Sequence, residues 1–266
     1  MNGELAQLVA LVTYGQAFLS SGGDAPELFG NHSAFKSVRR LSIHGPPPPD
    51  VPKTPPIYGR TAPWFQSLTD RAVVSLSAII FRGGQPLPDH ISVAFVGGGR
   101  WGIQAIAPTF AEAYAPHWSV IPGDRDPEAP WAVVYSYVPL EGPLQLISEP
   151  QITIRLARAI EECRQIAAVG DLPSWQGLFT KALALLEAGP STIPHFPDMV
   201  PAEHLASEDR QLLAAASAAW VFGGMGSWND LGFPDPALNE RYESASAALY
   251  DAVIDAVFIV ANRGAD

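Results

Sequence analysis

The sequence predicts an α+β fold in which a mainly antiparallel β-sheet packs against helices. Residues with β propensity concentrate at about 37–140, whereas helical periodicity dominates at about 150–263, and one more apolar helix begins the chain. Of the 266 residues, 47% are hydrophobic and 16% charged, which is enough apolar material for a packed core. We expect a single α+β domain over 1–266, and a β-rich part over 1–145 with a helical part over 146–266 is the alternative.

The first twenty residues are predicted to form a helix that docks on the core. Their apolar side chains recur at helical spacing, at Leu5, Val9, Val12 and Leu19. Glu4 precedes this run where a signal peptide carries positive charge, so we expect an ordinary helix. The other long apolar stretch, residues 252–261, contains Asp255 and is too short to span a bilayer. No membrane segment is therefore expected.

Six segments have the composition expected of strands in the predicted sheet. Val38–His44 alternates in part and is expected to be an edge strand. Seven prolines follow in Gly45–Tyr58, where we expect a stiff connector rather than a ligand of a proline-binding module, since no basic residue flanks it as an anchor. The other expected strands are Ala72–Phe81, Ile91–Val96, Trp101–Ile106, Trp118–Ile121 and Trp131–Val138.

Four helices are predicted after residue 150, layered over the sheet. The first carries Leu156, Ile160, Cys163 and Ala167 on its apolar stripe; the others run from Pro173 to Ala188, from Ser207 to Trp220 and from Asp235 through Val260. Arg158 and Glu162 are an expected ion pair on the polar side of the first. Cys163 is the only cysteine, so an internal disulfide and a cysteine-based metal site are excluded. We expect it to be a buried structural residue in a cytoplasmic protein.

The charge balance excludes several classes of partner. The chain has 27 acidic and 16 basic residues, a formal net charge of −11. Nucleic-acid binding depends on clustered Lys and Arg, so it is not expected here. Only three lysines are present, and none stands in a P-loop or a polybasic membrane tether. A basic protein is the partner that this charge favours.

Gly97, Gly99 and Gly102 have the G-x-G-x-x-G spacing of a dinucleotide-binding turn and follow an expected strand. However, Pro108 would interrupt the helix that such a turn requires, and the later chain lacks further β-α alternation. We therefore favour a hairpin turn between Ile91–Val96 and Trp101–Ile106, with no cofactor.

Two loops contain residue types found in metal or acid–base sites. Gly123–Glu128 holds three carboxylates that could bind Ca²⁺ or Mg²⁺, but Arg125 would compete for them, and a solvated acidic loop is favoured. A later connector holds the other set, His195, Asp198, Glu203 and His204. Their spacing matches no helix-borne zinc site, and we predict no metal and no catalytic residue.

Asp251 and Asp255 stand one helical turn apart in the last predicted helix. Such a pair could act in acid–base chemistry, but we favour a solvated helix face.

The segment from Trp220 to Asp230 is the strongest candidate for a binding surface. Aromatic side chains flank three glycines and a polar cluster, a composition common in binding surfaces. Together with the glycine turn, it supplies the candidate partner- or ligand-binding residues: Arg100, Trp101, Trp220, Trp228, Asn229 and Asp230. The alternative is a tight turn in which Trp228 closes the core and Asn229 and Asp230 cap backbone groups.

These observations favour a non-enzymatic, acidic, partner-binding protein, of the kind that inhibits a basic protein as immunity proteins and antitoxins do. The usage of many Ala, Pro and Arg residues with few Lys favours a bacterial source. The alternative is an enzyme, either a dinucleotide-dependent oxidoreductase that uses Gly97–Gly102 or a hydrolase built from the loop histidines and acids.

Overall fold

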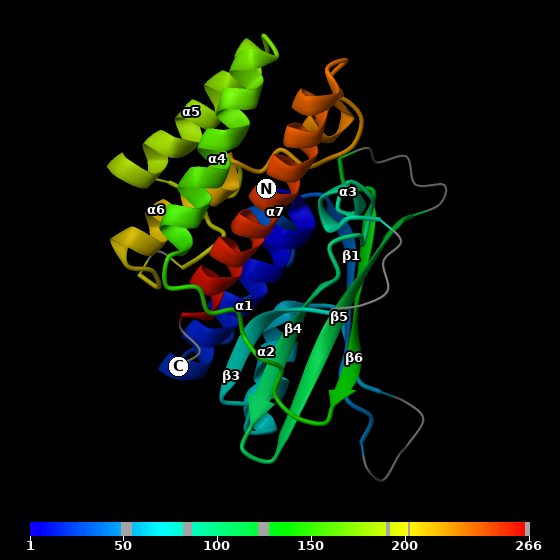
Figure 1. Cartoon of the computed structure of the whole chain (residues 1–266). Coiled ribbons are helices and arrows are strands. Elements are labelled where there is room, and N and C mark those ends of the chain that lie inside the picture. Colours follow the sequence, from blue (N-terminus) through cyan, green and yellow to red (C-terminus); the bar gives the residue numbers. More distant parts are fainter. Residues whose placement is uncertain (49–54, 82–86, 122–127, 190–191, 202, 264–266) are drawn as a thin grey trace.

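The predicted α+β class is confirmed by the computed structural model of the chain (Figure 1). The structure describes residues 1–48, 55–81, 87–121, 128–189, 192–201 and 203–263. The part of the acidic loop from Gly123 to Pro127 lies outside these residues, as do residues 49–54 of the proline-rich connector.

Six strands form one mixed sheet. They are β1 (Val38–His44), β2 (Ile57–Tyr58), β3 (Ser75–Ile80), β4 (Trp101–Ala107), β5 (Phe110–Val120) and β6 (Trp131–Leu140). Their order in the sheet is β2-β1-β6-β5-β4-β3, and every pair is antiparallel except β1 and β6. The sheet is thus mainly antiparallel, as predicted. The two-residue β2 lies outside β1, so β1 is not the edge strand that its sequence indicated.

Two of the strand predictions are wrong. Ile91–Val96 contains the end of the short helix α3 (Asp89–Ser92) and the turns after it. The segment pairs with no strand of the sheet, and although Val93 is buried, Phe95 is 64% exposed. In contrast, β5 begins at Phe110, well before the predicted Trp118. Its Ala-rich first half has weak β propensity, but pairing with β4 and β6 on its two sides overrides that preference.

The predicted helices are present. They are α1 (Gly3–Ser21), α4 (Ile152–Val169), α5 (Pro173–Ala188), α6 (Ser207–Ala218) and α7 (Pro236–Asn262). The sequence analysis missed α2 (Thr61–Asp70), whose Trp64, Phe65 and Leu68 form a buried face. Cys163 is buried on α4, as predicted, and burial raises the pKa of its thiol to about 12.

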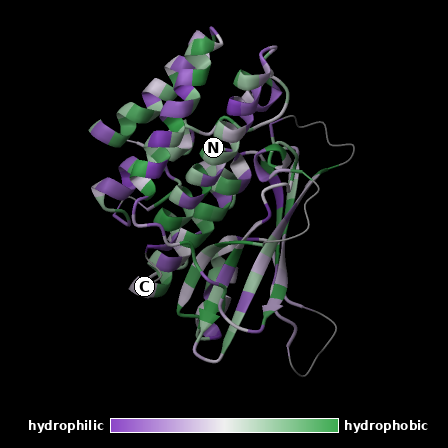
Figure 2. Cartoon of the chain, in the orientation of Figure 1, coloured by the Kyte–Doolittle hydropathy of each residue, from purple (hydrophilic) through white to green (hydrophobic). Residues whose placement is uncertain are grey.

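The helices form two layers on one side of the sheet (Figure 1). α1 and α7 contact each other and the sheet at β3, whereas α4 and α6 pack on α7, and α5 packs on α4 and α6. The late helices are thus layered over the sheet as predicted, and α7 is the one of them that contacts it at β3. Because α1 and α7 are covered from both sides, both are apolar over most of their circumference (Figure 2).

Among the described residues, one helix is long and apolar enough to cross a membrane. It is α7, and 72% of its most apolar window is buried inside the protein, as in a core helix.

Side-chain amides of the inner helices bind the free edge of β3. Asn262, the last residue of α7, accepts a hydrogen bond from Ala78 N at 2.7 Å and donates one to Ala78 O at 3.0 Å. Gln16 of α1 donates from Nε2 to Leu76 O at 2.7 Å. β3 is the last strand of the sheet, so these backbone groups lack a strand partner. The two amides satisfy them and fix both helices relative to the sheet.

We predict that Asn262→Ala lowers the free energy of unfolding by about 1–3 kcal/mol, because it leaves the buried Ala78 N–H and C=O without partners. Urea denaturation followed by circular dichroism measures this loss. As a control, Asn31→Ala at an exposed turn should change stability by less than about 0.5 kcal/mol. Equal stability of Asn262→Ala and the wild type would contradict this role for the amide.

Candidate functional site

Two segments that the sequence analysis selected lie side by side in the structure. Trp101 begins β4 and Trp220 follows α6, and their ring centroids are 6.0 Å apart. Trp220 also contacts Phe222 at 5.7 Å and Tyr250 of α7 at 6.4 Å. This aromatic cluster joins the start of β4 to the helical layers, and it brings the two glycine-containing segments together.

Trp228 is a core residue rather than a surface anchor. Its side chain is fully buried, and its indole N–H donates to Ser246 Oγ at 2.8 Å. The ring packs against Phe179 and Trp175 of α5 with centroid distances of 5.1 and 5.6 Å. Trp228 therefore stabilises the contact between α5 and α7 and offers no surface to a partner. The alternative interpretation of this segment, in which Trp228 closes the core, describes it correctly.

The two polar residues after Trp228 make backbone contacts. Asn229 donates from Nδ2 to His90 O at 2.9 Å, which ties the short helix η2 (Trp228–Asp230) to α3. The exposed Asp230 accepts a hydrogen bond from Gly226 N in the turn before it. Both residues thus fix the position of the loop that runs from α6 to α7.

The glycines at 97–102 do not form a phosphate-binding turn. Gly97 has φ +74° and donates from its backbone N–H to Glu4 Oε1 at 3.1 Å. The next residues lead into strand β4, which pairs antiparallel with both of its neighbours. The dinucleotide fingerprint requires a strand before the turn and a helix after it, and residues 87–121 contain neither in those places. The predicted hairpin is also wrong, since Ile91–Val96 is not a strand.

These glycines are needed for close packing instead. A Cβ on Gly98 would overlap the carbonyl oxygen of Ser92, and a Cβ on Gly102 would overlap the ring of Phe81. In both places backbone or ring atoms occupy the space that a side chain requires.

We predict that Gly98→Ala destabilises the fold by about 1–3 kcal/mol, because the Ser92 backbone must move to admit the methyl group. Thermal and urea unfolding measure the effect. Gly224→Ala is the matched control, since a Cβ there meets no atom within 4 Å and should cost less than about 0.5 kcal/mol. Equal costs for the two substitutions would show that close packing at Gly98 is unimportant.

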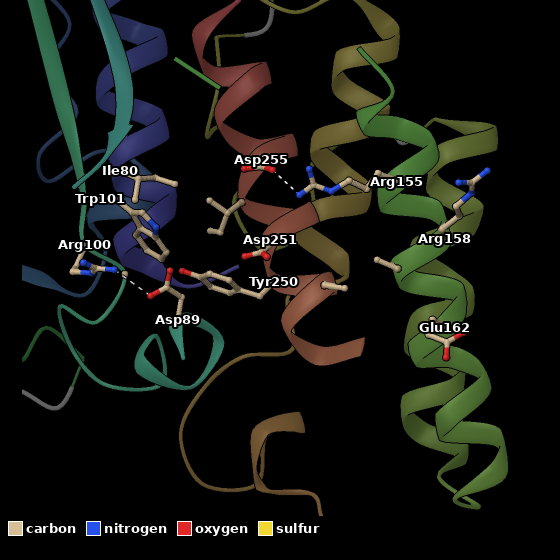
Figure 3. A pocket seen from close by; sticks show the side chains of 14 residues that line it. Ile80, Asp89, Arg100, Trp101, Arg155, Arg158, Glu162, Tyr250, Asp251 and Asp255 are labelled. Atoms are coloured by element: carbon tan, nitrogen blue, oxygen red, sulfur yellow. Dashed lines mark hydrogen bonds and ion pairs between the residues drawn. The ribbon is translucent and has the colours of Figure 1, made fainter. Parts of the chain in front are cut away.

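A cleft of about 1040 Å³ lies between α4 and the start of β4, with one face of α7 as its floor (Figure 3). Its charged side chains come from three places: Arg155, Arg158 and Glu162 on α4, Asp251 and Asp255 on α7, and Asp89 and Arg100 on the sheet side. The aromatic rings of Trp101 and Tyr250 line it between the sheet side and the floor. We call this hollow the α4–β4 cleft.

Ion pairs connect the walls of the α4–β4 cleft. Arg155 contacts Asp255 at 2.5 Å and so joins α4 to α7 (Figure 3). Asp255 is thus an ion-pair residue rather than part of a solvated face. Arg100 contacts Asp89 at 3.2 Å on the opposite side. The predicted pair of Arg158 with Glu162 is wrong, because Glu162 instead contacts Arg241 at 2.5 Å.

Asp251 lies on the floor between these pairs. Within the described residues it has no hydrogen bond or ion pair. Its pKa is raised above the ordinary value, first because the surrounding protein desolvates the carboxylate and second because Asp255 repels its negative charge. The cleft therefore holds one carboxylate whose charge is poorly compensated.

A second hollow, of about 380 Å³, lies under the turns after α3. Phe95 and Val96 form one side, Phe222 and Gly224 another, and Glu4 of α1 also lines it. We call it the Phe95 hollow. Phe95 is 64% exposed, Val96 is 51% exposed and Met225, next to Gly224 in the chain, is fully exposed. Exposed apolar side chains thus gather around a concave surface.

Of the loop histidines and acids, Asp198 and His204 make separate contacts. His32 Nε2 lies 2.6 Å from Asp198 O, and its Nδ1 accepts a hydrogen bond from Ala34 N. Ser33 donates its hydroxyl to the Asp198 carboxylate. Both ring nitrogens of His32 are thus engaged, and the Ser33 hydroxyl donates to a carboxylate rather than to an imidazole, so these three residues do not have the geometry of a catalytic triad. His204 lies elsewhere, with its Nε2 3.2 Å from Gln16 Oε1.

Among the described residues, no three His, Cys, Asp or Glu side chains lie close enough to hold a metal ion. Comparison of the chain with protein-family models, with curated proteins and with solved structures gives no match. The function is therefore argued from the geometry of the two hollows.

Burial lowers the pKa of four histidines, namely His32, His90, His195 and His204, from the ordinary value of 6.5. The unfolded chain therefore binds protons at a higher pH than the folded chain. Burial also lowers the pKa of the Met1 amino group, from 8.0 to about 5, so the same sign applies to it. We predict that stability falls as the pH is lowered from about 8 toward 5. Urea unfolding at a series of pH values measures this slope.

His32→Gln should reduce the slope, because it removes one of these groups. His117→Gln should leave it unchanged, because the His117 side chain is exposed. A slope that His32→Gln leaves equal to that of the wild type would contradict the assignment.

Proposed function

We propose that the protein binds a basic partner protein through the Phe95 hollow, in a non-catalytic role. The exposed side chains of Phe95 and Val96, which line this hollow, are the observation that carries the proposal. Apolar side chains that protrude beside a preformed hollow are common at protein–protein interfaces, where they are covered on binding.

The charge distribution supports a basic partner. Residues 150–266 hold 15 of the 27 acidic residues and 7 of the 16 basic residues, a formal net charge of −8. A carboxylate also stands next to the apolar side chains, since Glu4 lines the hollow. This charge would attract a basic surface and repel a second copy of the chain, which carries the same −11.

The two enzyme alternatives have less support. Gly97–Gly102 lead into a strand rather than a helix, and the Ser33 hydroxyl contacts Asp198 rather than a histidine ring. An inhibitor of the immunity or antitoxin kind requires a docking surface and no reactive group, which agrees with an apolar hollow in an acidic environment.

The test begins with affinity capture at low salt, followed by purification of the captured protein and measurement of its affinity. We predict a partner of basic pI whose Kd increases with ionic strength. The double variant Phe95→Ser with Val96→Ser should raise the Kd at least tenfold, because both side chains would lose the apolar contacts that the partner covers. Val169→Ser on α4 is the matched control, since Val169 is also 64% exposed but lies away from the hollow.

Three results would overturn the proposal: capture of no protein, self-association as the only interaction, or a partner that binds the double variant and the wild type equally well. Circular dichroism of the variants checks that they are folded.

A further inference from the structure

Glu4 is the one charged side chain among the described residues that line the Phe95 hollow. It stands in the first turn of α1, and its Oε1 accepts the hydrogen bond from Gly97 N at 3.1 Å. Within the described part of the chain it has no ion pair. Its pKa is raised, because desolvation by burial outweighs the hydrogen bond from Gly97. The hollow thus contains a partly desolvated carboxylate that lacks a counter-charge.

Aromatic rings surround this carboxylate in the wall of the hollow. Trp118 and Trp131 pack edge to face with ring centroids 6.2 Å apart, and the ring of Phe95 is 64% exposed. The aromatic residues that line the hollow are Phe95, Trp118, Trp131, Phe196 and Phe222. The face of an aromatic ring carries partial negative charge and attracts cations. The carboxylate and the rings therefore favour the same kind of ligand, a cation with an apolar body.

We propose that the Phe95 hollow receives an arginine side chain of the basic partner, with the guanidinium at Glu4 and the aliphatic stem against Phe95. This inference rests on the proposed function and names the group of the partner that the hollow recognises. A guanidinium donates hydrogen bonds to a carboxylate and stacks on aromatic faces, and these are the two surfaces that the hollow offers.

Glu4 and Phe95 lie close enough for one arginine to contact both. Glu4 Oε1 is 3.1 Å from Gly97 N, and Gly97 stands two residues after Phe95 in the chain. Because neighbouring Cα atoms are about 3.8 Å apart, the Cα atoms of these two residues are at most about 7 Å apart. An extended arginine side chain has a comparable length, so its stem can cover Phe95 while its guanidinium reaches Glu4.

Other side chains fit the hollow less well. Glu4 would repel a carboxylate, and an apolar side chain would remove water from Glu4 without supplying a counter-charge. A lysine ammonium is more strongly hydrated than a guanidinium and has no planar surface to stack on a ring. Arginine is also enriched at protein–protein interfaces, where it is among the residues that contribute most to affinity.

The first test compares the methylamides of N-acetylarginine and N-acetylcitrulline. Citrulline has nearly the shape of arginine, but the end of its side chain is neutral. We expect the arginine probe to bind at least about fivefold more tightly in NMR titrations at pH 7, with the largest shifts at residues that line the hollow. Equal affinities, or no binding up to the solubility limit of the arginine probe, would overturn the inference.

Glu4→Gln tests the carboxylate. The glutamine amide oxygen can still accept the hydrogen bond from Gly97, so the variant is expected to fold, which circular dichroism checks. The advantage of the arginine probe over the citrulline probe should disappear. Glu208→Gln is the matched control, because the exposed Glu208 is the second residue of α6 as Glu4 is of α1, and the same charge is removed. An advantage that persists in Glu4→Gln would contradict the role of Glu4.

The captured partner separates this inference from the proposed function. We expect Glu4→Gln to raise the Kd of the partner more than Glu208→Gln does. Equal Kd values for these two variants, together with a raised Kd for Phe95→Ser with Val96→Ser, would overturn the inference and leave the proposed function standing. A partner that binds this double variant and the wild type equally well would overturn the proposed function itself.

Discussion

The burial of α1 and α7 between the sheet and the outer helices is the constraint on which the rest of the structure depends. Both helices must be apolar on nearly all sides, and α7 needs 27 residues to run past the sheet as well as the outer helices. The outer layer and the sheet leave one face of α7 open around Asp251 and Asp255. The α4–β4 cleft is thus a direct consequence of the layer arrangement rather than an added feature.

Polar groups inside this apolar layer fix the geometry of the fold. Gln7 accepts a hydrogen bond from the Tyr135 hydroxyl of β6 at 2.9 Å, and Gln16 and Asn262 bind the edge of β3. Apolar contacts alone allow helices to slide on a sheet, whereas a buried hydrogen bond allows one register, since any other leaves its groups unsatisfied. In the sequence, Gln7 and Gln16 only interrupt an apolar run. Their actual role depends on strands that lie far away in the chain.

The sequence predicts those elements whose apolar residues recur with a regular local period. The helices α1, α4, α5, α6 and α7 follow from apolar spacing and end signals, and the fold class follows from their separation from the strands. The strand predicted at Ile91–Val96 is wrong because an apolar run does not show whether another strand will pair with it. The strand predicted at Trp118–Ile121 is too short, because the Ala-rich first half of β5 is extended only through pairing with strands on both of its sides.

The candidate site was predictable only in part, for the same reason. Trp220 and Trp101 were recognised from composition, but their contact at 6.0 Å joins segments that only the tertiary structure brings together. The sequence predicts that Arg158 pairs with Glu162, because the two residues stand four apart on one helix. In the structure Glu162 instead contacts Arg241 of α7. Spacing along a helix indicates which ion pairs are possible, and contacts with distant segments determine which of them form.

The segment from Asp89 to Trp101 belongs to both hollows and links them physically. Asp89, Arg100 and Trp101 line the α4–β4 cleft, whereas Phe95 and Val96 line the Phe95 hollow. The same segment is held by Asn229 on one side and by Glu4 on the other. Gly98 packs directly against Ser92 within this segment, so one closely packed stretch of chain contributes to the walls of both hollows.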